Sequence, residues 1–333
     1  MNSQRFLFIS TPFRSGSALL SRNLNAHSQI SLLNDSLKYF NFCYNRYLPL
    51  TESNISRMLN NVEQRLLKRF DINIEVQTCL DKIKQQPVSQ ASIYAILLQH
   101  LFRNQNKRFI GEMESISWSR IPLFLNMFPN SKALLIVRDL RDVVVSFKKK
   151  TIAPDNDYLV AIFNVIDAMD HFIECKNNFP DRFHGIRFEE LKKDPEKVMK
   201  RSCEFLGLDY EPEMINEDNW TDYHGEKWKN RKVSSFYNEG DHHSPVERWR
   251  RLITPEELFL CEWIGRRQML ALNMRIEGQP VSQKIFNNAI KMITSSNLLK
   301  ESFKKWCETG KGIQRYPLDP TDPSTWDKNP KTS

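Results

Sequence analysis

Short apolar runs alternate with segments of helical periodicity along this chain. Residues 6–9 and 133–137 are uninterrupted apolar runs, typical of strands that are buried on both faces of a parallel sheet. After the first run, Leu20 and Leu24 lie one helical turn apart, and a second helix is expected after the other run. The alternation predicts an α/β fold in three layers, with a central, mostly parallel sheet flanked by helices.

The rest of the pattern divides the chain. Residues 37–105 carry apolar positions at helical spacing and predict a helical insertion between the second and third strands. Residues 281–306 predict one or two amphipathic helices, and the tail after Gly310 is rich in proline. We therefore expect one domain over residues 1–275, followed by a helical extension with a Pro-rich tail over residues 276–333.

A tight turn with the sequence PFRSGS (residues 12–17) follows the first strand. Such a turn aims backbone N–H groups and a helix N-terminus at one point, which suits a phosphate or sulfate. Arg14 adds a planar, permanently charged fork for oxyanions. A triphosphate loop needs a Gly-Lys-Ser/Thr end and a dinucleotide loop needs three glycines, whereas this turn contains Gly16 alone. An anion cradle and an ordinary strand–helix turn both remain open at this point.

A second basic site follows the apolar run 133–137. Arg138 comes directly after that run, where open α/β sheets bind their ligands, and Ser146 lies eight residues further on. The alternative for Arg138 is a surface ion pair with Asp139 or Asp142. A single ligand with two separated phosphate-like groups would explain both loops.

Four segments, in this order, resemble sulfotransferases that use 3′-phosphoadenosine 5′-phosphosulfate (PAPS). PFRSGS resembles the family's 5′-phosphosulfate loop, and VRDLRDVVVSF (137–147) resembles its 3′-phosphate motif. Residues 185–214 and 244–258 resemble a later strand-plus-helix segment and the C-terminal basic-Trp loop. The resemblance covers about residues 5–275 with a gap at 40–105. It implies the P-loop NTPase-like sulfotransferase fold and an enzyme that converts PAPS to PAP, the 3′,5′-bisphosphate.

The resemblance also implies cofactor contacts. The Arg form of the first loop is similar to that of tyrosylprotein and carbohydrate sulfotransferases and their bacterial relatives. The implied cofactor residues are Arg14, Ser15, Gly16, Ser17, Ala18, Arg138, Ser146, Lys150, Ser234, Ser235, Arg248 and Trp249. The chain departs from its relatives in two places: it lacks their helper Lys near Met113, and it has Phe188 where they often have Tyr.

Sulfuryl transfer is expected to depend on positioning and charge, by analogy with phosphoryl transfer. Arg14 is the expected cation beside the oxygen that gains charge as the bond breaks. The acceptor must lose a proton to a base. Asp35 aligns with the catalytic Glu of tyrosylprotein sulfotransferases, although it could instead cap the next helix. Glu112 and Glu114 compete for the base role, or could form ion pairs with basic residues such as Arg14, Arg108 and Arg120.

Composition and charge fit such an enzyme. The chain has 333 residues, of which 40% are hydrophobic and 26% charged, as in ordinary soluble proteins. Its net charge of +8 would attract a polyanionic cofactor, and no motif indicates nucleic-acid binding. No cysteine or histidine spacing predicts a metal site, and no apolar run reaches the length of a membrane span. We therefore expect a cytoplasmic enzyme that needs no metal.

The acceptor is open at the level of sequence. Carboxylates near the site favour a small polar acceptor that is neutral or cationic, such as a natural product with an amine or guanidinium group. A peptide tyrosine or a sugar hydroxyl is an alternative. A non-catalytic protein that binds nucleotides or nucleic acid on a related fold is the alternative of a different class.

Overall fold

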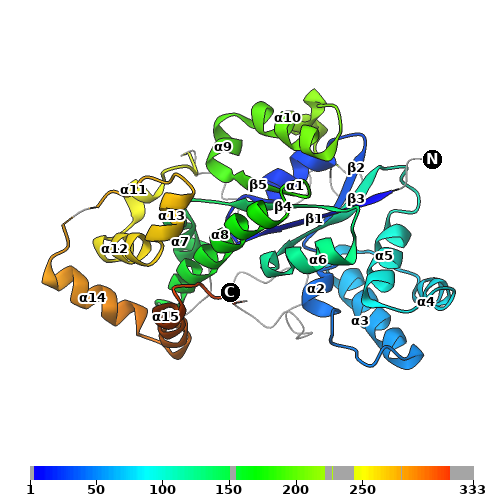
Figure 1. Ribbon diagram of the computed structural model, residues 1–333, viewed down its shortest axis with the longest axis horizontal. Coiled ribbons are helices and arrows are strands. Elements are labelled where there is room, and N and C mark those ends of the chain that lie inside the picture. The colour runs from blue at the N-terminus through cyan, green and yellow to red at the C-terminus, as the bar shows by residue number, and fades with distance from the viewer. Residues whose placement is uncertain (1–3, 151–154, 222–226, 228–243, 279, 316–333) are drawn as a thin grey trace.

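The computed structural model describes residues 4–150, 155–221, 227, 244–278 and 280–315. Within them, five strands form one parallel sheet in the order β2-β3-β1-β4-β5 (Figure 1). The strands are β1 (Arg5–Thr11), β2 (Ile30–Asn34), β3 (Phe109–Ser115), β4 (Lys132–Val137) and β5 (Phe183–Arg187). This sheet confirms the predicted α/β class. Because all strands run in the same direction, their carboxyl ends meet at one edge.

The described helices surround this sheet. They are α1 (Ser17–Asn25), α2 (Tyr39–Phe42), α3 (Glu52–Phe70), α4 (Val76–Lys84), α5 (Gln90–Leu101), α6 (Ile121–Met127), α7 (Leu140–Lys150), α8 (Val160–Asn178), α9 (Phe188–Lys193), α10 (Pro195–Leu206), α11 (Trp249–Leu252), α12 (Pro255–Ile264), α13 (Arg266–Ala271), α14 (Gln283–Ile293) and α15 (Asn297–Thr309). Short 3₁₀ turns occupy Trp118–Arg120, Asp157–Leu159, Pro212–Ile215 and Glu217–Asn219.

Side chains alternate across the sheet and so build two cores. Leu7 and Ile9 pack with residues of α1, α9 and α10 on one face. Phe8 points to the other face, where its ring centroid lies 5.1 Å from those of Phe40 in α2 and Phe124 in α6. Helices thus cover both faces of the sheet, which gives the three layers that the sequence predicts (Figure 1).

Four helices, α2 to α5, lie between β2 and β3, in the segment where the sequence predicts a helical insertion. Helix α3 begins after Thr51, whose hydroxyl accepts a hydrogen bond from the N–H of Asn54. Its apolar stripe includes Val62 and Leu66, which are buried. Arg65 lies on the same stripe and is also buried, so this helix carries a charge into the core.

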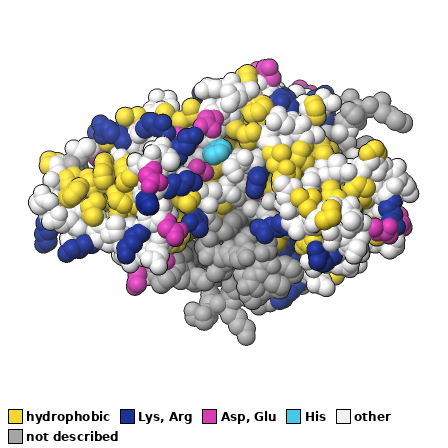
Figure 2. Space-filling model, turned by 60° about the horizontal axis from the view of Figure 1, so that its bottom comes forward, with side chains coloured by type: hydrophobic (Ala, Val, Ile, Leu, Met, Phe, Trp, Pro, Cys, Tyr) yellow, Lys and Arg dark blue, Asp and Glu magenta, His cyan; other side chains and the backbone are white. Residues whose placement is uncertain are grey.

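The last helices extend one end of the molecule. Helices α12, α14 and α15 share a cluster of aromatic rings, and Figure 2 shows hydrophobic side chains gathered on the surface of this end. Trp263 and Phe286 of this cluster are exposed. No helix within the described residues is long and apolar enough to cross a membrane.

The chain then returns from α15 to the core. The N–H of Ile313 donates to the carbonyl of Phe163 in α8 at 3.1 Å. Asn164 accepts from the N–H of Arg315 at 2.8 Å and donates to its carbonyl at 2.9 Å. The extension is therefore fixed to helix α8 by one backbone hydrogen bond and by two hydrogen bonds with the Asn164 side chain.

Candidate active site at the carboxyl ends of the strands

The loop after β1 is shaped to hold an anion. Arg14 and Gly16 both have left-handed backbone conformations, with φ of 67° and 95°. A Cβ atom on Gly16 would lie 2.3 Å from the ring of Phe188, so only glycine fits there. Ser15 is fully buried, and its Oγ has no hydrogen-bond partner within the described part of the chain. A buried hydroxyl without a partner beside a helix N-terminus suits an anionic ligand.

Helix α1 starts directly after this cradle. No side chain caps it at Gly16, and its first turn, which includes Ser17 and Ala18, contains no acidic residue. Its first N–H groups and the positive end of its dipole therefore face the loop without a competing carboxylate.

The two basic loops meet. Arg14 Nε donates to Ser146 Oγ of α7 at 3.0 Å, and Arg138 Nη1 donates to the carbonyl of Arg14 at 2.8 Å. The Arg138 guanidinium lies 4.7 Å from the ring centroid of Phe188, and its Nε has no hydrogen-bond partner among the described residues. Segments more than 120 residues apart in sequence thus share one site.

The C-terminal basic-Trp loop is fastened next to Arg138. The carboxylate of Asp142 accepts from the backbone N–H groups of Glu247 and Trp249, both at 2.9 Å, and lies 3.9 Å from Arg138. The residue between the two donors is Arg248, so this anchor holds Arg248 beside the second loop. Arg138 therefore pairs with Asp142, but both side chains are buried, so this is not the surface ion pair that the sequence left open. The same carboxylate also positions a further cation.

Trp249 itself is buried between two guanidinium groups. Arg141 lies 3.9 Å and Arg250 lies 4.5 Å from its ring. Asp139 pairs with Arg141 at 2.7 Å. The ring of Trp249 thus packs within the protein, and its predicted contact with the cofactor stays a prediction. The predicted contacts of Ser234, Ser235 and the side chain of Lys150 lie outside the described residues.

Asp35 stands at the end of β2 with a left-handed backbone, φ 54°. Its Oδ1 accepts from the Ser115 N–H at 2.9 Å and lies 3.1 Å from Lys38 Nζ, while Oδ2 accepts from Ser115 Oγ at 2.6 Å. The side chain is 29% exposed. Helix α2 begins only at Tyr39, with Lys38 at its cap position, so Asp35 does not cap that helix.

Glu112 and Glu114 have different surroundings. Both are fully buried on one face of β3. Glu112 accepts from the N–H of Lys38 at 2.9 Å, and Glu114 accepts from the N–H groups of Asn41 at 2.9 Å and Phe40 at 3.3 Å. These two carboxylates therefore cap the start of α2, where a helix favours negative charge.

Burial raises the pKa of both glutamates. The pKa of Glu112 lies well above its usual range because of burial and the neighbouring Glu114. Burial raises the pKa of Glu114 to about 7, although the charge of Lys38 lowers it in part. Glu114 is thus partly protonated near neutral pH.

Two residues that the sequence analysis did not select complete this region. Arg65 donates from Nη1 to the carbonyl of Ser36 and from Nη2 to that of Leu37, and its guanidinium lies 3.8 Å from the ring centroid of Phe42. Lys38 is the other, through its ion pair with Asp35. In the sequence, the one feature that could have pointed to Arg65 is its position within an apolar stripe, because a charged side chain there needs a buried partner.

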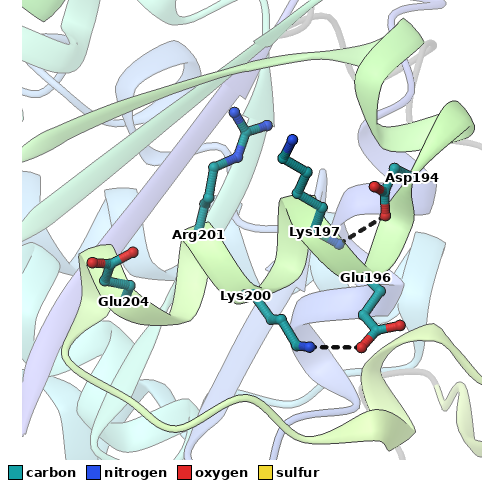
Figure 3. Close-up of a pocket in the computed structure, with 6 residues that line it drawn as sticks. All are labelled: Asp194, Glu196, Lys197, Lys200, Arg201 and Glu204. Atoms are coloured by element: carbon teal, nitrogen blue, oxygen red, sulfur yellow. Dashed lines mark hydrogen bonds and ion pairs between the residues drawn. The ribbon is translucent and has the colours of Figure 1, made fainter.

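A separate shallow pocket lies along α10 (Figure 3). Its lining is charged throughout, with Lys200 2.7 Å from Glu196 and Asp194 accepting from the N–H of Lys197. Since these charges largely neutralise one another, the pocket is a poor candidate for a ligand site. No group of three or more His, Cys, Asp or Glu side chains within the described residues could hold a metal ion.

Fold and site together define an α/β protein with two basic loops in contact at one edge of a parallel sheet. The model of the sulfotransferase family matches residues 7–212. The chain therefore belongs to the sulfotransferase family, as the motifs predict.

Two solved structures share the fold. The sulfotransferase domain of the curacin biosynthetic pathway is 21% identical with a TM-score of 0.55, covering 82% of this chain and 99% of that domain. The sulfotransferase domain of the Synechococcus PCC 7002 olefin synthase is also 21% identical, with a TM-score of 0.54, covering 82% of this chain and 95% of that domain. At this identity the likeness extends to the fold alone.

Curated relatives match over shorter parts of their length. A Caenorhabditis briggsae protein, named as a candidate protein-tyrosine sulfotransferase, is 27% identical over 106 residues, which are 29% of this chain and 36% of the relative. An uncharacterized Aquifex aeolicus protein is 21% identical over 260 residues, which are 75% of this chain and 31% of the relative. The chain thus spans about a third of the length of these relatives.

Proposed function

We propose that this protein transfers a sulfuryl group from PAPS to a hydroxyl or nitrogen of an acceptor. The observation that carries the proposal is the contact between the two basic loops, through Arg14, Ser146 and Arg138. PAPS has two separated anionic groups, and the protein has two adjoining cradles for them. The orphaned Ser15 Oγ and Arg138 Nε supply donors that such a ligand would satisfy.

Each cradle takes one end of the cofactor. The 5′-phosphosulfate end is assigned to Arg14, Ser15, Gly16, Ser17 and Ala18, and the 3′-phosphate end to Arg138, Ser146 and Arg248. Further proposed contacts are Lys150, Ser234, Ser235 and Trp249. When bound, PAPS supplies the activated sulfuryl group. Arg14 contributes a fixed positive charge beside the oxygen on which negative charge develops.

Asp35 is the proposed base. Its Oδ2 carries one hydrogen bond within the described residues, so this oxygen has room for the proton of an acceptor. It is also the most accessible of the three carboxylates, because Glu112 and Glu114 are fully buried and bound to backbone N–H groups. Ser115 holds the carboxylate in place through both of its oxygens.

The proposed acceptor is a small polar natural product that is neutral or cationic. The partly exposed carboxylate of Asp35 would repel an acidic glycan, whereas an amine or guanidinium group would be attracted. A peptide tyrosine is the second candidate, and the name of the C. briggsae relative favours it.

Two substitutions separate cofactor binding from turnover. Wild type should bind PAP in the micromolar range by calorimetry, and Arg138→Ala should lose that binding. Asp35→Asn should bind PAP normally but lose turnover by about 10²–10⁴-fold. Asp71→Asn is the matched control, since Asp71 is another left-handed aspartate, at the exposed end of α3.

Turnover is measured with labelled PAPS and a panel of tyramine, agmatine, a tyrosine peptide and glucosamine, read by mass shift. A protein that binds ATP with Mg²⁺ but ignores PAP would contradict the proposal. Salt-sensitive binding to arbitrary RNA without any preference for PAP would favour a nucleic-acid-binding protein instead.

A further inference from the structure

Lys38 is a buried lysine at the acceptor side of the site. Its side chain is only 8% exposed, and its Nζ lies 3.1 Å from Asp35 Oδ1. Its backbone is left-handed, with φ 48°, which is uncommon for a lysine. Glu112 binds its N–H at 2.9 Å, and Arg65 binds the two carbonyls that precede it. The surrounding structure therefore fixes this residue in place.

Lys38 places a positive charge beside a carboxylate whose orientation other hydrogen bonds already fix. Ser115 donates to both oxygens of Asp35, through its N–H and its hydroxyl, and so sets the plane of the carboxylate. A buried ammonium group loses most of its hydration, and its pairing returns only part of that cost. Retaining Lys38 here therefore calls for a reason beyond the orientation of Asp35.

The need for a cation follows from the local charges. The Lys38 ammonium group pairs with the Asp35 carboxylate, and its charge also lowers the pKa of the buried Glu114 in part. The oxygens of a sulfuryl group are electron-rich, so the Asp35 carboxylate alone would repel them. A cation beside this carboxylate offsets that repulsion.

We propose that Lys38 is the charge-balancing partner of Asp35 in the transfer reaction. This inference rests on the proposed function. The acceptor O–H or N–H bond breaks, its proton goes to Asp35 Oδ2, and the electron pair left on the acceptor atom forms the new bond to sulfur. The electron pair of the broken sulfur–oxygen bond stays with the departing phosphate. Asp35 is then neutral, and the charge of Lys38 acts on the sulfuryl oxygens.

Substitution of Lys38 tests the role in the full-length protein. Lys38→Met should lower kcat by about 10²-fold while the Kd for PAP is unchanged. Lys38→Arg keeps the cation and should retain most of the activity. Lys132→Met is the matched control, because Lys132 also contacts the protein, through the carbonyl of Asp181, but lies at the opposite end of the sheet.

Chemical rescue distinguishes charge from structure. Ethylamine, a free cation, should restore the turnover of Lys38→Ala in a saturable way, whereas ethanol should not. The inference is overturned if Lys38→Met stays within about threefold of wild-type kcat, or if ethylamine fails to rescue a Lys38→Ala protein that is folded and binds PAP. If wild type itself neither binds PAP nor consumes PAPS with any panel acceptor, the proposed function fails and the role of Lys38 fails with it. If only the Lys38 results differ from those expected, the proposed function stands and the role of Lys38 alone is overturned.

Discussion

At the scale of single residues, burial separates three carboxylates that look alike in sequence. Asp35 keeps an accessible oxygen, whereas Glu112 and Glu114 are enclosed and hold the first N–H groups of α2. Enclosure disfavours the charged form, which is why the pKa of Glu114 rises to about 7. A group of this kind makes the stability of the protein depend on pH.

Glu114→Gln should remove part of that dependence. The folded-state pKa of about 7 exceeds the ordinary value of 4.5, so the group favours folding below pH 4.5 and loses that contribution as pH rises through 7. Between pH 5 and pH 8, wild type should lose up to about 3 kcal/mol more unfolding free energy than Glu114→Gln. Urea unfolding at both pH values measures the difference, and equal losses in the two proteins would contradict this assignment.

At the scale of elements, the helical insertion supports the loop that carries Asp35, the proposed base. Helix α3 sends Arg65 into the core, where it binds the carbonyls of Ser36 and Leu37 and stacks on Phe42. These carbonyls belong to the four-residue stretch that runs from Asp35 to Lys38. The insertion between β2 and β3 thus fixes the loop between β2 and α2.

Arg65→Met should therefore weaken both folding and turnover. Two buried carbonyls would lose their donor, at a cost of about 1–3 kcal/mol each in unfolding free energy. The kcat should fall because Asp35 is held less firmly, while the Kd for PAP should stay the same because the cofactor loops do not contain Arg65. Arg57→Met, on the exposed side of the same helix, is the control. A lost PAP affinity with a normal kcat would contradict this role.

At the scale of the whole molecule, the C-terminal extension reaches back to the site. Gln314 donates to the carbonyl of Ile116 at 2.9 Å and accepts from Ser119 Oγ at 2.6 Å. Ile116 follows Ser115, the partner of Asp35, and has φ 55°, a rare conformation for a β-branched residue. The end of the described chain thus braces the loop after β3. The proposed division into residues 1–275 and 276–333 remains a prediction.

Gly312→Val should undock this extension. A Cβ at Gly312 would lie 2.1 Å from the carbonyl oxygen of Phe163, so the segment must move away from α8. We expect faster hydrogen exchange or proteolysis over residues 297–315 and a lower kcat. Lys311→Ala, which removes only an exposed ion pair, should leave both unchanged. Unaltered protection in Gly312→Val would show that the extension is not docked in this way.

Local patterns determined much of this protein. Apolar runs and helical spacing indicated the parallel sheet, and the residue types in PFRSGS and around Arg138 indicated two anion-binding loops and the family. These features can be predicted from sequence because each depends on residues that are neighbours in the chain. The sequence also contained the right carboxylates, but it left open which of them is the base.

Tertiary structure decided the rest. The contact of Arg14 with Ser146, the ion pair of Lys38 with Asp35 and the burial of Arg65 and Glu114 all depend on which segments meet in space. The pKa and the interaction energy of a charged group depend on its desolvation and on partners that can lie far away in the sequence. A sequence pattern identifies a charged residue, but only the fold sets the surroundings that make it an accessible carboxylate, a helix cap or one half of a buried ion pair.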